Sequence, residues 1–190
     1  LYGLQSEEDA ARAVQLGAPA ENVEIMHSAK YDVAERDPEA ERLRRDQLLQ
    51  SGFLEEDSVI LLGSSTWPGE ERCLMECYES LRNVYPGLRL ILVPRHFERR
   101  AEVVSDAEAL GLTLASWSEK KESHWGQADV LMVDTTGELK HFTGFADMVF
   151  VGKSLFRKEG QNPLEAANAG KFVVTGPGMN NFRRILNDLQ

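Results

Sequence analysis

Short apolar runs alternate with amphipathic stretches along almost the whole chain, and this alternation restricts the fold more than any other feature. We expect helices over residues 6–16, 37–50, 66–84, 97–110, 163–169 and 181–189, and a short one from about residue 136. We expect strands over residues 23–27, 58–62, 88–93, 112–115, 129–133, 147–151 and 171–175, and a polar loop over 116–127. Continuous apolar strands separated by helices are typical of a parallel sheet covered on both faces. The sequence therefore predicts an α/β fold with a doubly wound parallel sheet.

The loops that follow the strands are where such a fold predicts a binding site. In doubly wound sheets, ligands bind beyond the carboxyl ends of the strands. The loops selected by this rule are 63–67, 94–100, 134–138 and 152–165.

The charge of the chain is unevenly distributed. Its 190 residues carry a net charge of −10, and 42% of them are hydrophobic and 27% charged. These values suit one soluble domain and argue against a disordered or fibrous chain. The acidic balance argues against a nucleic-acid binder. However, residues 153–190 contain six basic and three acidic residues, so this basic end indicates a local anion site.

The sequence gives no sign of a metal site, a disulfide or a membrane span. Cys73 and Cys77, the only cysteines, are one helical turn apart, which favours two reduced thiols. No apolar run approaches the ~20 residues of a transmembrane helix, and no signal peptide is visible. The chain starts at Leu1 without a methionine and ends at Gln190 inside a helical pattern, so we expect it to be a piece of a longer protein.

Two of the strand-end loops have residues suited to an anion. Residues 63–70 combine glycines and small hydroxyl residues, which let backbone N–H groups approach an anion at a helix start. Helix capping by Ser65 or Thr66 is the simpler interpretation of that loop. Pro94 stiffens the next turn, and Arg95 is placed to meet an anion or stack on a base unless it is only solvated.

The two later loops combine a helix start with a carboxylate. Gly137 opens access to backbone amides, although Asp134 could be only a helix cap and Glu138 only a partner of the helix dipole. Pro163 fits the first position of a helix capped by Asn162, and Glu165 then lies in the first turn. A carboxylate there is suited to a ribose diol, since both hydroxyls donate. The alternative is that Glu165 only interacts favourably with the positive end of the helix dipole.

Several of these loops occur together and in the same order as in the Kdo (3-deoxy-D-manno-octulosonic acid) transferases of lipopolysaccharide synthesis, which the chain resembles over nearly its whole length. The motifs that carry the resemblance are Ser65-Thr66 with Gly69-Glu70, Pro94-Arg95-His96 with Glu98-Arg99, Asp134 to Leu139, Ala146-Asp147 with Phe150 to Gly152, and Asn162 to Ala166. Residues 5–9 and 30–32 also look like that family.

The resemblance implies a GT-B glycosyltransferase of two Rossmann-like domains, with residues 1–190 forming the C-terminal, donor-binding one. It implies inverting, metal-independent transfer of Kdo from CMP-Kdo to lipid A precursor at the cytoplasmic face of the bacterial inner membrane. No cofactor is implied, and the general base and the acceptor groove are expected in a missing N-terminal domain, so the isolated chain is expected to be soluble and inactive. The implied CMP-binding residues are Pro94, Arg95, Thr136, Gly137, Glu138, Asn162, Pro163, Leu164 and Glu165.

Two positions depart from the family pattern. Gln161 replaces the histidine of a Gly-Gly-His sequence and cannot carry a positive charge, and Lys153 replaces the second glycine of a Gly-Gly-Ser sequence. We include Ser64, Ser65, Lys153 and Gln161 as candidate contacts to the donor sugar. The alternatives are another GT-B nucleotide-sugar enzyme, such as a UDP-sugar transferase or epimerase, or a non-catalytic module that binds sugar nucleotides.

Overall fold

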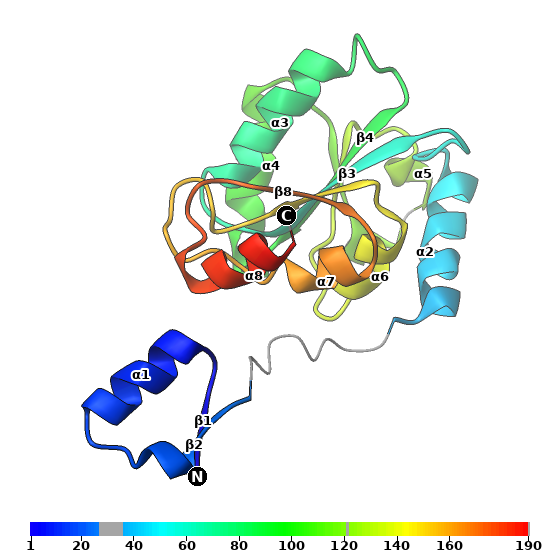
Figure 1. Cartoon of the computed structure of the whole chain (residues 1–190). Coiled ribbons are helices and arrows are strands. Elements are labelled where there is room, and N and C mark those ends of the chain that lie inside the picture. The colour runs from blue at the N-terminus through cyan, green and yellow to red at the C-terminus, as the bar shows by residue number, and fades with distance from the viewer. Residues whose placement is uncertain (27–35, 121, 190) are drawn as a thin grey trace. The chain divides into compact units, whose positions relative to one another are not determined.

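The computed structural model describes residues 1–26, 36–120 and 122–189, which form two compact units, one within residues 1–34 and one within residues 35–190 (Figure 1). The expectation of one donor-binding domain over 1–190 remains a prediction. Residues 30–32, which contribute to the family resemblance, and His27 at the end of one expected strand lie outside the described residues. Among the described residues, no helix is long and apolar enough to cross a membrane.

The first unit is a small βαβ arrangement. Strand β1 (Tyr2–Leu4) pairs in parallel with β2 (Val23–Ile25), and helix α1 (Glu7–Gln15) connects them ahead of a 3-10 turn, η1 (Ala20–Asn22). The predicted helix is confirmed, and Ser6 caps it because its hydroxyl accepts the N–H of Asp9 at 3.0 Å. Strand β1 was not predicted because its three residues form no apolar run.

The second unit contains a six-stranded, entirely parallel sheet in the order β5-β6-β4-β3-β7-β8. The first strand of this unit, β3, lies inside the sheet. The next three strands along the chain, β4 to β6, lie on one side of β3, and the last two, β7 and β8, lie on the other. The topological switch point is therefore between β3 and β7. The strands are β3 (Val59–Thr66), β4 (Leu88–Pro94), β5 (Leu114–Ser116), β6 (Val130–Met132), β7 (Met148–Val151) and β8 (Phe172–Thr175).

Helices cover both faces of this sheet (Figure 1), so the predicted doubly wound α/β fold is confirmed. One face packs against α3 and α4, and the other against α2, α5, α6 and α7. Side chains alternate between the faces along each strand: Ile91 belongs to one core cluster, and Leu90 and Leu92 to the other. The helices are α2 (Pro38–Ser51), α3 (Glu70–Leu81), α4 (Arg100–Ala109), α5 (Glu122–Trp125), α6 (Leu139–Phe145), α7 (Leu164–Asn168) and α8 (Arg183–Asp188), and the 3-10 turns are η3 (Phe97–Arg99), η4 (Trp117–Glu119) and η5 (Asn180–Phe182).

Two expectations about local structure are wrong. Gly63, Ser64 and Ser65 were predicted as a loop but belong to β3, because in the middle of the sheet Gly63 and Ser64 pair with both β4 and β7. Ser65 lies at a register shift between Ser64 and Thr66. Helix α3 consequently starts at Glu70, and neither Ser65 nor Thr66 caps it. Residues 116–127 were predicted as a loop, but they contain η4 and α5. Their polar composition gave no helical pattern, and the burial of Trp125 stabilises α5 against the core.

The close approach of β3 and β7 predicts that Gly152 cannot carry a side chain. A Cβ atom there would overlap the carbonyl oxygen of Ser65 and lie 2.7 Å from the Cα atom of Thr66. We expect Gly152→Ala to lower the free energy of unfolding by about 2–3 kcal/mol, since backbone must move. Urea unfolding followed by tryptophan fluorescence measures this, because all three tryptophans lie in the second unit.

Gly87→Ala is the matched control. Its added Cβ would meet nothing closer than the carbonyl oxygen of Asp57 at 3.5 Å, an ordinary contact. A Gly152→Ala variant as stable as the Gly87→Ala variant would contradict the steric argument.

Candidate functional site

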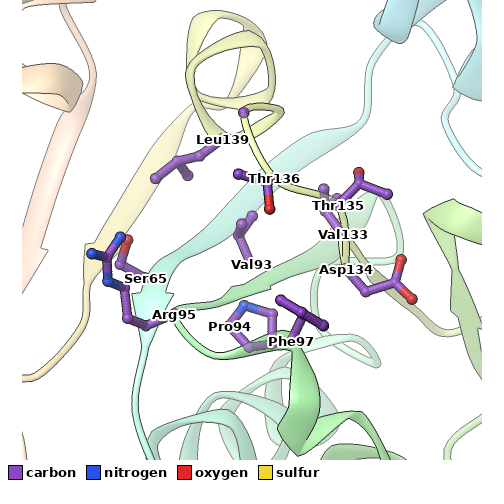
Figure 2. A pocket seen from close by; sticks show the side chains of 11 residues that line it. Ser65, Val93, Pro94, Arg95, Phe97, Val133, Asp134, Thr135, Thr136 and Leu139 are labelled. Atoms are coloured by element: carbon purple, nitrogen blue, oxygen red, sulfur yellow. The ribbon is translucent and has the colours of Figure 1, made fainter.

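A pocket of about 120 Å³ lies at the carboxyl edge of the sheet, where β3, β4 and β6 end (Figure 2). This is the edge at which the fold predicts a ligand. The residues that line it are Ser65, Val93, Pro94, Arg95, Phe97, Val133, Asp134, Thr135, Thr136, Gly137 and Leu139.

The pocket brings together five of the thirteen residues expected in the donor site. Ser65, Pro94, Arg95, Thr136 and Gly137 line it. The others do not: Ser64 is buried within β3, Glu138 pairs elsewhere, and Lys153, Gln161, Asn162, Pro163, Leu164 and Glu165 follow β7. Helix α7, which starts within residues 162–165, contacts α6, and the first residue of α6, Leu139, lines the pocket.

Arg95 presents an unpaired cation to the pocket. Its backbone N–H donates to the carbonyl of Thr66 at 3.0 Å, which fixes the turn. The side chain is exposed, and among the residues that the structure describes its guanidinium has no hydrogen-bond or ion-pair partner. Figure 2 shows this guanidinium beside Ser65. The planar group is thus free to bind a phosphate or to stack on a base.

Glu138 is held by an arginine from a distant helix. The guanidinium of Arg44 on α2 donates to both carboxylate oxygens, at 2.9 and 3.0 Å, and the two side chains are only 21% and 18% exposed. The hydrogen bonds from Arg44 lower the pKa of the Glu138 carboxyl below its ordinary value. Both carboxylate oxygens are therefore engaged, and the pair fixes the start of α6 beside Gly137. Sequence reasoning could not find Arg44, which is 94 positions away.

Glu165 has the opposite environment. Its Oε1 atom is buried and has no hydrogen-bond partner within the described part of the chain. Burial raises the pKa of its carboxyl, and Lys140 only partly offsets this. Asn162 supports the turn before it by accepting the N–H of Leu164 at 3.1 Å, but α7 starts at Leu164, so Pro163 and not Asn162 is at the N-cap position. A buried carboxylate oxygen without a partner is rare in folded proteins and indicates an unmet donor, such as a ligand hydroxyl.

Two further buried polar atoms at this edge lack partners among the described residues, the hydroxyl Oγ1 of Thr135 and the indole Nε1 of Trp67. Thr135 lines the pocket after β6, and Trp67 follows β3. The strand-end rule predicted both loops as binding loops, but the sequence did not single out these two side chains. Asp134 is not the helix cap that it could have been: it accepts hydrogen bonds from the backbone and hydroxyl of Ser118 and lies 3.5 Å from Arg100.

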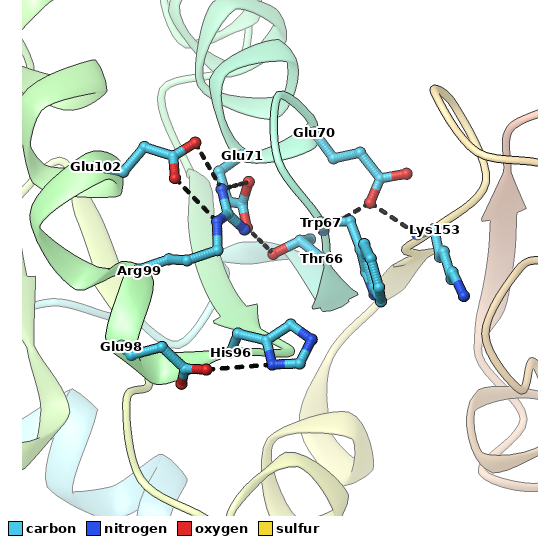
Figure 3. Close-up of polar contacts among 9 residues, drawn as sticks. All are labelled: Thr66, Trp67, Glu70, Glu71, His96, Glu98, Arg99, Glu102 and Lys153. Carbon is cyan, nitrogen blue, oxygen red and sulfur yellow. Dashed lines mark hydrogen bonds and ion pairs between the residues drawn. The ribbon is translucent and has the colours of Figure 1, made fainter.

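Two buried glutamates at the start of α3 hold the turns around the switch point (Figure 3). The carboxylate of Glu70 accepts the backbone N–H groups of Trp67, Lys153 and Ser154, each at 2.8 Å, and that of Leu155 at 3.0 Å. Glu71 accepts the hydroxyl of Thr66 at 2.9 Å and both terminal nitrogens of Arg99. These contacts position the turns that follow β3, β4 and β7.

The Arg44–Glu138 pair predicts a stability effect that depends on pH. Arg44→Gln should lower the free energy of unfolding at pH 7 by about 1–2 kcal/mol, because it leaves a half-buried carboxylate without its partner. The pKa of Glu138 is lowered in the folded chain, so the stabilisation is present above the ordinary pKa of 4.5 and is lost as the pH falls through the lowered pKa. The difference between the variant and the parent should therefore shrink as the pH falls below 4.5.

Urea unfolding at several pH values measures this effect. Arg45→Gln is the control, since Arg45 lies on the same helix but pairs with the exposed Glu56, and we expect it to cost less than about 0.5 kcal/mol. A loss in Arg44→Gln that is equally large at acidic pH would mean that Arg44 stabilises only by packing.

Comparison with known proteins connects this chain to one family, although no family model matches it. It is 33% identical over 192 residues to the 3-deoxy-D-manno-octulosonic acid transferase of Haemophilus influenzae and 36% identical over 188 residues to that of Bordetella pertussis. The alignments cover 100% and 97% of this chain but only 43% and 42% of the two relatives.

Solved structures agree with the sequence comparison. The fold matches the C-terminal CMP-Kdo-binding domain of WaaA from Acinetobacter baumannii, with a TM-score of 0.70 and 27% identity, over 80% of this chain and 78% of that one. HepE from Anabaena matches in fold alone, with a TM-score of 0.50 and 16% identity over 93% of this chain and 45% of that one. By sequence and by fold, the chain is a homologue of the Kdo transferases and spans less than half the length of the relatives that it matches.

Proposed function

We propose that this chain supplies the CMP-Kdo-binding part of an enzyme that transfers Kdo to a lipid A precursor. Its relatives and the CMP-Kdo-binding domain that it resembles in fold support the proposal. The observation that carries it is the pairing of groups at the carboxyl edge: an unpaired arginine in the pocket and a buried glutamate oxygen without a partner beyond the neighbouring strand. A guanidinium suits a phosphate, and a free carboxylate suits the hydroxyls of a ribose.

The residues have different roles in this proposal. Arg95, against the rigid Pro94, binds the CMP phosphate or stacks on its base, and Thr136 and Gly137 offer backbone N–H groups at the start of α6. Glu165 accepts from the ribose hydroxyls, with Asn162, Pro163 and Leu164 shaping its turn. Glu138 is a positioning residue rather than a ligand contact, since Arg44 occupies both of its oxygens. Ser65 in the pocket and Ser64 and Gln161 nearby are candidate neighbours of the donor sugar.

The reaction in the whole enzyme is an inverting, metal-independent displacement. A base outside this chain takes the proton of the acceptor hydroxyl, whose oxygen forms a bond to the anomeric carbon of Kdo. The bond from that carbon to the CMP oxygen breaks, and CMP leaves with the electron pair. Arg95 and the backbone amides then stabilise the departing phosphate. We expect the chain alone to bind the donor without transferring Kdo, and the whole enzyme to act at the cytoplasmic face of the inner membrane.

Calorimetry with CMP, UDP and ADP tests the proposal. We expect CMP to bind best, and Arg95→Ala to weaken CMP binding about tenfold or more, because a hydrogen bond to a charged group is lost. Arg42→Ala, which removes the same charge from an exposed site on α2, should leave CMP binding unchanged. Preference for UDP would instead favour a UDP-sugar enzyme, and binding of none of the three would contradict a nucleotide site.

The environment of Glu165 predicts that its substitution weakens ligand binding but stabilises the empty chain. Glu165→Gln should weaken CMP binding about tenfold, since a charged acceptor of ribose hydroxyls becomes neutral. It should also raise the unfolding midpoint of the empty chain at pH 7, because burial raises the pKa of this carboxyl and its ionised form is costly. The gain in stability of Glu165→Gln over the parent is present above the raised pKa of Glu165, where the parent's carboxyl is ionised. It disappears as the pH falls through that pKa towards 4.5.

Thermal unfolding at several pH values and calorimetry with CMP measure the two effects. Glu108→Gln on the exposed surface of α4 is the control and should change neither. A Glu165→Gln variant that binds CMP as well as the parent would remove Glu165 from the site.

A further inference from the structure

Lys153 occupies a backbone conformation that lysine seldom adopts. Its φ is +60°, in the left-handed region that glycine enters without strain. The carboxylate of Glu70 holds it there by accepting its N–H and those of Ser154 and Leu155. The carbonyl of Lys153 also accepts the N–H of Gly160 at 3.0 Å, which closes the following loop. A strained residue that its surroundings hold so firmly is a reason to look for a role of its side chain.

The side chain of Lys153 lies over an aromatic ring at the same edge of the sheet. Its ammonium is 4.5 Å from the centre of the Trp67 ring, and Trp67 meets His96 edge to face at 5.3 Å. Figure 3 shows the tryptophan between the lysine and the histidine. His96 directly follows Arg95, and Trp67 is two residues after Ser65, which also lines the pocket. Lys153 is therefore a second cation beside the pocket, on the far side of the turn after β3.

This second cation is available to an anion. Its side chain is 23% exposed, and its one ion-pair partner among the described residues is the half-exposed Glu159 at 3.8 Å, beyond hydrogen-bonding distance. The Trp67 ring restricts the ammonium without neutralising it, since a cation–π contact leaves the N–H donors free to bind. A ligand carboxylate could thus replace the weak contact with Glu159.

We propose that Lys153 binds the carboxylate of the donor sugar, and that Glu70 is the positioning residue that aims it. This inference rests on the proposed function, because CMP-Kdo carries two anionic groups, a phosphodiester and the carboxylate of its acidic sugar. Arg95 in the pocket takes the first, and Lys153 beyond Trp67 takes the second. Lys153 accordingly distinguishes an acidic sugar from a neutral one attached to the same nucleotide.

Comparing the affinities for CMP and CMP-Kdo separates the contribution of the sugar from that of the nucleotide. The variant is Lys153→Gly, because glycine keeps the left-handed backbone without strain. We expect calorimetry to give about a tenfold or greater loss of affinity for CMP-Kdo and less than about a twofold loss for CMP, which has no sugar carboxylate. Lys153→Arg should restore most of the affinity for CMP-Kdo. The matched control is Lys158→Gly, which removes the same charge from an exposed position and should change neither affinity.

Equal losses for the two ligands, or no loss for CMP-Kdo, would overturn the assignment of Lys153. Binding of neither ligand by the parent chain would instead overturn the proposed function, so the two failures are distinguishable. A double-mutant cycle with Glu70→Gln tests the positioning role. If Glu70 acts through Lys153, the losses of CMP-Kdo binding free energy in the two single variants should not add up in the double variant, whereas independent effects would add. If Glu70→Gln does not fold, the Lys153 comparison decides the proposal by itself.

Discussion

The carboxylate of Glu70 is the contact on which the geometry of the binding edge depends. Glu70 is fully buried and gathers four backbone N–H groups from the two turns that follow β3 and β7. A buried carboxylate is expensive to desolvate, and only such a set of charge-assisted hydrogen bonds makes it tolerable. Because β3 and β7 flank the switch point, this one side chain sets how the turns on the two halves of the sheet face each other. Gly152, which contacts the backbone of Ser65 and Thr66, allows the turns to approach that closely.

The glutamates of this region divide by whether the protein satisfies them. Glu70, Glu71 and Glu138 accept hydrogen bonds from backbone amides or arginines to both oxygens, so they fix turns and helix starts. Glu165 alone of these four keeps a buried oxygen without a hydrogen-bond partner among the described residues. Saturated carboxylates have little left to offer a ligand, whereas an unsatisfied one gains a hydrogen bond when a ligand hydroxyl arrives. The same division applies to the arginines: Arg44 and Arg99 form ion pairs, whereas Arg95 has no partner in the described part of the chain.

A chain with a net charge of −10 can therefore still present an anion site. Its acidic residues near the sheet edge are neutralised locally, as Glu71 is by Arg99 and Glu138 by Arg44. Local geometry, and not net charge, decides the potential at the site, since screening limits the reach of distant exposed charges to about 10 Å. In the proposed site, Arg95, which has no partner among the described residues, and the weakly paired Lys153 supply the positive charge for a doubly anionic donor.

The sequence by itself determined the alternating elements, the parallel sheet and the sheet edge where the pocket lies, because apolar periodicity, helix caps and turn residues act over a few positions. It also predicted Pro94, Arg95, Thr136 and Gly137 as site residues, since the strand-end rule and the family resemblance point to the same loops, and all four line the pocket. Only the tertiary structure decided that Gly63 to Ser65 continue a central strand, that Arg44 saturates Glu138, and that Glu70 brings Lys153 to Trp67. The residues that make these contacts are as many as 94 positions apart in the chain, and no local pattern encodes which of them meet. The packing of the sheet and its helices makes that choice.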